Sequence, residues 1–197
     1  MTLTVIACGA LAREVLTVCA QKGLDHVDLR CLPAIYHNHP ERIVPGVERL
    51  IREARADGAS DVLVAYGDCG TGGALAATVE RLGARMLPGA HCYAFFEGVE
   101  AFEARGEIDA FYLTDFLARH FEAFVVAPLK LRAHPELREM MFAHYAKVVH
   151  LEQALDPAVR EHARKAAKFL NLPLERRQTG YGALETALET AGERASV

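Results

Sequence analysis

Short apolar runs alternate along this chain with longer segments whose apolar residues recur at helical spacing. Strands that alternate with helices in this way predict βαβ units and a mostly parallel sheet. The expected fold class is therefore α/β, a mostly parallel sheet flanked by helices. The first half has expected strands at residues 3–7, 29–34, 61–65 and 85–87, and expected helices after Leu11 and at 42–56 and 74–82.

The order of these strands follows from the handedness of their connections. Crossovers between parallel strands are almost always right-handed, and the simplest arrangement is then 2-1-3-4. Such an order reverses direction between strands 1 and 3, where open α/β sheets bind ligands. We therefore expect a site at the carboxyl ends of these strands.

The second half repeats this outline loosely. The run Phe124–Leu131 before His134 parallels the strand at 29–34, and an expected strand at Val148–Leu151, a helix at 157–170 and a strand near Leu174 follow. This leaves open a degenerate internal duplication into two Rossmann-like halves. The expected organisation is a first half at 1–97, a connection at 98–110, a second half at 111–191 and a frayed tail at 192–197.

Composition excludes several classes of protein. Hydrophobic residues make up 51% of the 197 positions, but no long apolar run predicts a membrane span. The net charge of −4 and the scattered Lys and Arg residues give no basic field for nucleic acid. No basic segment precedes the first apolar run, so we expect a cytoplasmic protein without a signal peptide. A small-molecule ligand is the expected partner, and the sequence leaves room for an oligomer.

Three of the five cysteines follow expected strand ends. An odd count without close pairing favours free or metal-bound thiols over a disulfide framework. Cys19 and Cys31 fit a helix face and a strand, whereas Cys8, Cys69 and Cys92 each stand in a loop after a strand. Because neighbouring carboxyl ends meet at one edge of a parallel sheet, we expect these three cysteines to bind one metal centre.

The spacing of the strands bears on the identity of the metal. Three thiolates on one zinc ion lie about 3.8 Å apart, given Zn–S bonds of roughly 2.3 Å. Three adjacent strand ends span roughly 10 Å, since neighbouring strands are about 4.8 Å apart. This spread favours an iron–sulfur cluster with three cysteine ligands, and zinc is the alternative.

Other candidate residues lie in the same loops. The loop of Gly70, Thr71, Gly72 and Gly73 opens a helix, so its N–H groups are expected to hold an anionic group of a ligand or cofactor. A histidine near the metal would handle protons as general acid or base. The candidates for this role are His37, His91 and His134. The expected substrate-binding residues are His39, Arg176, Arg177 and Tyr181.

Several of these motifs together resemble a known family. They are Ala7-Cys8-Gly9, Tyr66-Gly67-Asp68-Cys69-Gly70, His91-Cys92, the run Tyr112–Phe116 and His134-Pro135-Glu136-Leu137. From about residue 3 to residue 190, the chain resembles the domain-of-unknown-function 1638 family. The family brings no established activity. The resemblance implies only a neighbourhood, since members are often encoded beside corrinoid-dependent methyltransferases, so corrinoid or methyltransferase proteins are expected partners.

The leading expectation is a metal-dependent enzyme or accessory protein that binds a small polar or anionic ligand near one-carbon metabolism. One alternative is a non-catalytic metal or cofactor carrier. Another is a cysteine-nucleophile enzyme in which Cys69 attacks and His91 is its base.

Overall fold

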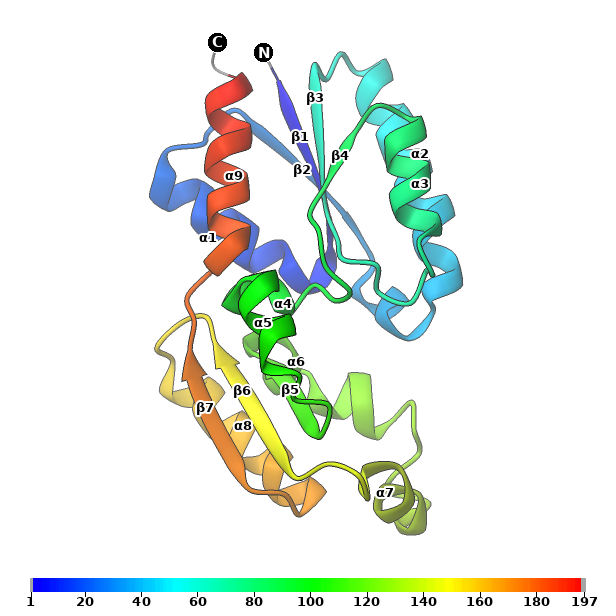
Figure 1. The fold of residues 1–197 in the computed structure, drawn as a ribbon, viewed down its shortest axis with the longest axis vertical. Helices are drawn as coiled ribbons and strands as arrows, with labels where there is room; N and C mark the ends of the chain where they lie inside the picture. Colours follow the sequence, from blue (N-terminus) through cyan, green and yellow to red (C-terminus); the bar gives the residue numbers. More distant parts are fainter. Residues whose placement is uncertain (1, 196–197) are drawn as a thin grey trace. The chain divides into compact units, whose positions relative to one another are not determined.

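The computed structural model describes residues 2–195, which form two compact α/β units (Figure 1). One unit contains the chain through Val99 and again from Tyr181 on, and the other is Glu100–Gly180. The sequence analysis placed residues 111–191 together in a second half. Instead, helix α9 (Gly182–Ala195) returns to the first unit, because Leu184 and Leu188 are buried in that unit's core.

The first unit is built on a four-stranded parallel sheet with the order β2-β1-β3-β4. This confirms the predicted order 2-1-3-4. Its strands are β1 (Leu3–Cys8), β2 (Val27–Leu32), β3 (Asp61–Ala65) and β4 (Arg85–Met86). Its helices, besides α9, are α1 (Ala12–Lys22), α2 (Ile43–Ala56), α3 (Ala74–Arg81) and the short α4 (Ala94–Glu97). Strand β2 begins and ends two residues earlier than expected, and Pro33 follows it.

The alternation of side chains along β1 divides the core of this unit into two layers. Leu3, Val5 and Ala7 pack with α1 and α9 on one face of the sheet. Ile6 and Cys8 point to the other face, which α2 and α3 cover (Figure 1). Helices on both faces explain why the central strands β1 and β3 are nearly continuous apolar runs. Cys8 therefore ends its strand on the α2–α3 face.

The second unit contains a three-stranded parallel sheet with the order β5-β6-β7. The strands are β5 (Ala110–Thr114), β6 (Lys147–Glu152) and β7 (Leu174–Gln178). The helices are α6 (Asp115–Arg119), α7 (Pro135–Phe142) and α8 (Pro157–Leu170), and α5 (Val99–Arg105) leads into the unit. The structure confirms the predicted strands near Val148 and Leu174 and the predicted helix at 157–170.

The run Phe124–Leu131, which the sequence analysis compared with a strand, forms the end of a π-helical turn and the turns that follow it. Residues Glu122–Val126 form a π-helical turn in which Ala127 N–H donates to Glu122 O at 2.8 Å, and the wide turn continues with Leu131 N–H to Val126 O at 3.0 Å. Local i→i+5 hydrogen bonds thus replace strand pairing here. The strand that begins the second sheet is β5, which the sequence analysis did not assign. Internal duplication stays a prediction.

The expected tail at 192–197 is helical as far as Ala195, because α9 extends to that residue. Residues 196–197 lie outside the described residues. Within residues 2–195, no helix has the length and apolar character needed to cross a bilayer.

The start of α9 generates a prediction about stability. Gly182 has a φ of 49°, and a Cβ there would lie 2.5 Å from the carbonyl oxygen of Phe95. Gly182→Ala adds this backbone clash to the strain of a left-handed alanine, which alone costs roughly 1–2 kcal/mol. Gly83→Ala is the matched control, since Gly83 has a φ of 61° and open space around it. Thermal unfolding should show a clearly larger loss of Tm for Gly182→Ala, and equal losses would contradict this packing.

Candidate functional site

Two of the three loop cysteines are in direct contact. The Sγ atoms of Cys69 and Cys92 lie 3.0 Å apart, although 23 positions separate the residues in sequence. Both thiols are free and partly buried. The backbone of Cys69 has a φ of 48°, which is uncommon for a residue other than glycine. The sequence analysis expected these two residues in one site with Cys8, and the structure places their side chains in contact.

The loops that follow β3 and β4 are joined by their backbones. Asp68 N–H donates to Gly89 O at 2.9 Å, and Cys69 N–H donates to Ala90 O at 2.8 Å. Gly67 permits this approach, because a Cβ there would lie 2.8 Å from the backbone of His91. The two hydrogen bonds continue the pairing of the strands past their ends and place Cys69 beside Cys92.

The third cysteine reaches the same neighbourhood from β1. Cys8 is buried at 7% exposure, at the last position of that strand. Burial raises the pKa of its thiol, and the nearby Cys69 adds to the increase. A charge on Cys69 therefore acts on Cys8, as expected for neighbouring strand ends.

Tyr66 is a member of this group that the sequence analysis missed. Its side chain is only 1% exposed, and its hydroxyl has no hydrogen-bond partner of good geometry among the described residues. Burial raises the pKa of Tyr66, and the thiols of Cys8, Cys92 and Cys69 raise it further. The phenol is therefore neutral and has its hydroxyl among the three thiols. Its place directly after an apolar strand, one residue before a glycine, was the available signal.

The contact shifts the pKa values of the two paired thiols in opposite directions. The hydrogen bond from Cys92 lowers the pKa of Cys69, and the same contact, together with burial, raises the pKa of Cys92. Cys69 is therefore the more acidic thiol of the pair. We call Cys8, Tyr66, Cys69 and Cys92 the thiol cluster.

Within residues 2–195, no three side chains of His, Cys, Asp or Glu stand already arranged as a metal site. The donor chemistry of the thiol cluster nevertheless suits a thiophilic metal. It offers three sulfur donors and a buried hydroxyl that lacks a partner. A metal would require Cys8 to join the existing pair.

Two of the three candidate histidines lie near the thiol cluster. Burial lowers the pKa of His91 and that of His37, and the nearby His91 lowers the pKa of His37 further. Both side chains still have exposed surface, and His91 stacks on Tyr93 at a centroid distance of 4.9 Å. Both imidazoles are thus neutral at pH 7 and open to solvent, as a proton carrier requires.

The glycine loop already binds a carboxylate of its own. Asp68 accepts hydrogen bonds from Gly72 N–H at 3.0 Å, Gly73 N–H at 2.6 Å and the hydroxyl of Thr71 at 2.9 Å. The N–H of Gly73 is the main cause of the lowered pKa of Asp68, and Gly70 N–H contributes. An external anion would have to displace this carboxylate, so the structure gives the expected anion cradle no free donors.

The remaining candidates fall into both units. In the first unit, His39 lies 3.4 Å from Glu41, and Tyr181 packs against the α1–α9 core. In the second unit, His134 is exposed and lies 3.2 Å from Glu136. Arg176, also exposed, lies 3.6 Å from a carboxylate oxygen of Glu152. The structure therefore does not gather these residues with the thiol cluster within one unit.

Arg177 belongs to an ion-pair network on the second sheet. Its guanidinium bonds Glu107 at 2.7 Å and Glu175 at 2.6 Å, and Lys147 bonds the same two carboxylates, each at 2.7 Å. Arg177, followed by Lys147, lowers the pKa of Glu107. A paired guanidinium of this kind is not open to a substrate anion, so its role is structural.

This network predicts a pH-dependent contribution to stability. The folded pKa of Glu107 lies below its unfolded value, so the stabilisation is complete at neutral pH. It begins to decrease below the ordinary glutamate pKa of about 4.3 and is lost progressively as the pH falls towards the lowered folded pKa. Glu107→Gln should cost about 1 kcal/mol at pH 7, and this difference from the wild type should shrink in acid. Urea unfolding across pH tests it, with exposed Glu103→Gln as control. A difference that does not change with pH would count against the network.

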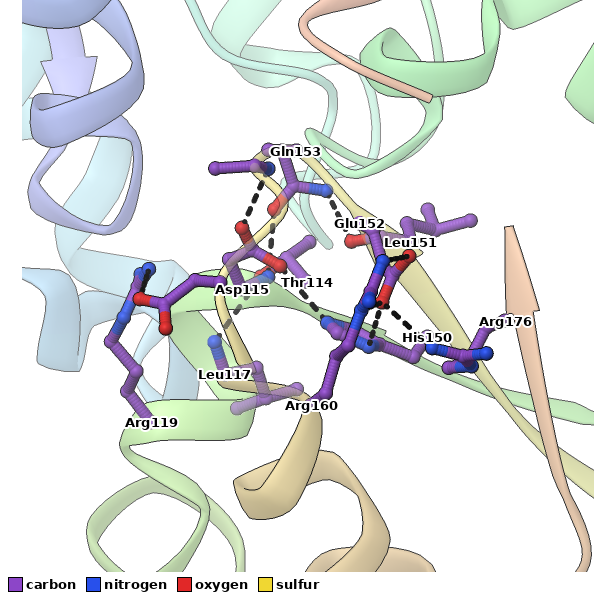
Figure 2. A network of polar contacts seen from close by, with 12 residues as sticks. Thr114, Asp115, Leu117, Arg119, His150, Leu151, Glu152, Gln153, Arg160 and Arg176 are labelled. Atoms are coloured by element: carbon purple, nitrogen blue, oxygen red, sulfur yellow. Dashed lines mark hydrogen bonds and ion pairs between the residues drawn. The ribbon is translucent and has the colours of Figure 1, made fainter. Parts of the chain in front are cut away.

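A second polar centre lies at the carboxyl ends of β5 and β6 (Figure 2). His150 is fully buried, and its Nε2 lies 2.9 Å from Asp115 Oδ1, while its Nδ1 lies 3.9 Å from Glu152. Asp115 Oδ2 also accepts from Ala154 N–H at 3.0 Å. Glu152 in turn pairs with Arg160 at 2.6 Å.

This polar centre connects α6 with β6, and the side chains of Asp115, His150 and Glu152 are all buried. Asp115, His150 and Glu152 are each at most 3% exposed, and Gln153 adds a bond from Asp115 N–H to its amide oxygen at 2.7 Å. The group ties the start of α6 to the end of β6. The signal in the sequence was the spacing of His150 and Glu152, two residues apart and so on one face of an apolar strand.

Removal of one member should therefore destabilise the second unit. Asp115→Ala leaves the buried imidazole and the N–H of Ala154 without their carboxylate, at a cost of about 3 kcal/mol or more. Exposed Asp109→Ala is the control. Chemical unfolding followed by circular dichroism would measure both. A loss below about 1 kcal/mol for Asp115→Ala would show that the contact contributes little.

Comparison with known proteins identifies a family but no activity. A family model described as "Protein of unknown function (DUF1638)" matches residues 31–188. No curated protein and no solved structure matches the chain.

Proposed function

This chain belongs to the DUF1638 family of proteins of unknown function, and from that premise we propose that its first unit is a metal-dependent enzyme or accessory protein. In this proposal Cys8, Cys69 and Cys92 bind the metal, and a small polar or anionic ligand binds beside it. The carrying observation is the contact of 3.0 Å between the Sγ atoms of Cys69 and Cys92, with Cys8 at the neighbouring strand end.

The separation of the two sulfurs favours a single metal ion over a cluster. Two thiolates on one tetrahedral zinc ion lie about 3.8 Å apart. The pair is thus within about 1 Å of that distance, and small side-chain rotations cover the difference. An iron–sulfur cubane binds each cysteine on a different iron and needs a wider spread. We therefore favour zinc, the alternative of the sequence analysis, over the iron–sulfur cluster.

The residues around the metal have separable roles in this proposal. Three thiolates leave one coordination position open, and zinc there would act as a Lewis acid on a bound ligand. Tyr66 offers a neutral, buried hydroxyl near Cys8 that can donate a hydrogen bond to a thiolate or to the ligand. His91 or His37 would exchange protons with solvent, since both have exposed surface.

A second candidate is the cysteine-nucleophile enzyme. Its specific observation is the left-handed backbone of Cys69, because strained conformations of this kind concentrate at functional positions. The two candidates differ in one measurement, since a nucleophile needs no bound metal.

The metal-centre proposal predicts that the three loop cysteines act as one set. Cys8→Ser, Cys69→Ser and Cys92→Ser should each remove most of the metal, because each change takes one of three protein ligands. Protein purified without oxygen would be assayed for zinc, iron and acid-labile sulfide, which also decides between a zinc ion and a cluster.

The two other cysteines provide matched controls. Cys19→Ser and Cys31→Ser should retain the metal, since neither residue lies in the cluster. Circular dichroism of every variant separates loss of a ligand from loss of folding. Wild-type protein without stoichiometric metal, or a folded loop-cysteine variant that keeps all of it, would rule out the three-cysteine site.

A further inference from the structure

The contact between Cys69 and Cys92 has a second chemical consequence. A disulfide has an S–S bond of about 2.05 Å, so the two free sulfurs need to approach by only about 1 Å more. The backbone hydrogen bonds from Asp68 to Gly89 and from Cys69 to Ala90 hold the loops in place in the reduced protein. The two thiols are therefore already close enough for disulfide formation in the reduced protein.

We propose that Cys69 and Cys92 form a reversible redox site that reacts with low-molecular-weight disulfides such as oxidised glutathione. The other pairings are less favoured by position. Cys8 is buried at the end of β1, and Cys19 and Cys31 lie outside the thiol cluster. Cys31 lies outside the pair, and burial and the nearby Cys8 raise the pKa of its thiol, so it provides a comparison within the same chain.

The reaction balances as two thiol–disulfide exchanges. The thiolate of one cysteine attacks a sulfur of the small disulfide, which forms a mixed disulfide and expels one small thiolate. The second cysteine, after losing its proton, attacks the protein sulfur of that mixed disulfide and expels the other small thiolate. Two protein thiols are oxidised to one disulfide, and one small disulfide is reduced to two thiols.

Oxidation would also control the metal, and this part rests on the proposed function. The disulfide removes two of the three thiolates, and Cys8 alone cannot retain an ion that needs three protein ligands. The site would then bind metal when reduced and release it when oxidised.

The chain is well suited to a direct test, because trypsin separates all five cysteines. Cleavage after Arg13, Lys22, Arg30, Arg42, Arg81 and Arg85, among other sites, leaves each cysteine on its own peptide. The full chain, purified without oxygen, is incubated with glutathione at increasing ratios of oxidised to reduced form. Free thiols are then blocked and the peptides are identified by mass spectrometry, while a chromogenic chelator records released zinc.

We expect the Cys69–Cys92 linkage to account for most of the first two thiols lost. It should form at a lower proportion of oxidised glutathione than the mixed disulfide on Cys31, and dithiothreitol should reverse it. In Cys92→Ser the reaction should stop at a mixed disulfide on Cys69. In Cys8→Ser the linkage should still form, which separates it from metal binding.

Each part of the inference has its own contrary result. Linkage of Cys8 to either partner in preference, or glutathione mixed disulfides alone, would overturn the redox site. A Cys69–Cys92 linkage in protein that never contained metal would leave the redox site standing and reject the metal centre. Bound metal that persists while the linkage forms would overturn the proposed control of metal binding.

Discussion

The hydrogen bonds that continue β3 past its end determine how the first unit presents its cysteines. Strand β3 pairs with β1 on one side and with β4 on the other, and β4 contributes only two paired residues. The bonds from Asp68 and Cys69 to Gly89 and Ala90 extend this short pairing. They fix the two loops to each other where the sheet itself has ended. Gly67 is essential to this approach, because any side chain there would meet the backbone of the opposite loop.

Much of this arrangement could be predicted from the sequence, because it depends on periodicity and handedness. Apolar runs and right-handed crossovers led to the strand order, and the strand order led to three cysteines at one edge. The contact between Cys69 and Cys92 lies at this predicted edge. Tyr66 escaped it, since a tyrosine beside a strand resembles an ordinary core residue until its hydroxyl proves to lack a partner.

Other features could not be predicted because non-local or competing local interactions decide them. Helix α9 follows the second sheet in sequence, yet Leu184 and Leu188 are buried in the first unit, and no periodicity records which core a helix joins. The loop Gly70–Gly73 has the composition of an anion cradle, but Asp68 in the same segment takes its donors. The run Phe124–Leu131 is apolar enough for a strand, but local i→i+5 hydrogen bonds fold it into the end of a π-helical turn followed by further turns.

The two units use polar residues at the carboxyl ends of their strands in opposite ways. Around His150, the ring nitrogen Nε2 and both oxygens of Asp115 have partners within the protein, Nδ1 lies 3.9 Å from a carboxylate oxygen of Glu152, and the group is closed to solvent. Such a network fixes the ends of β5 and β6 and has little left to offer a ligand. The thiol cluster differs from it, since the thiols of Cys69 and Cys92 are only partly buried and contact each other at 3.0 Å. The first sheet edge is therefore the one at which we propose that a metal and its ligand bind.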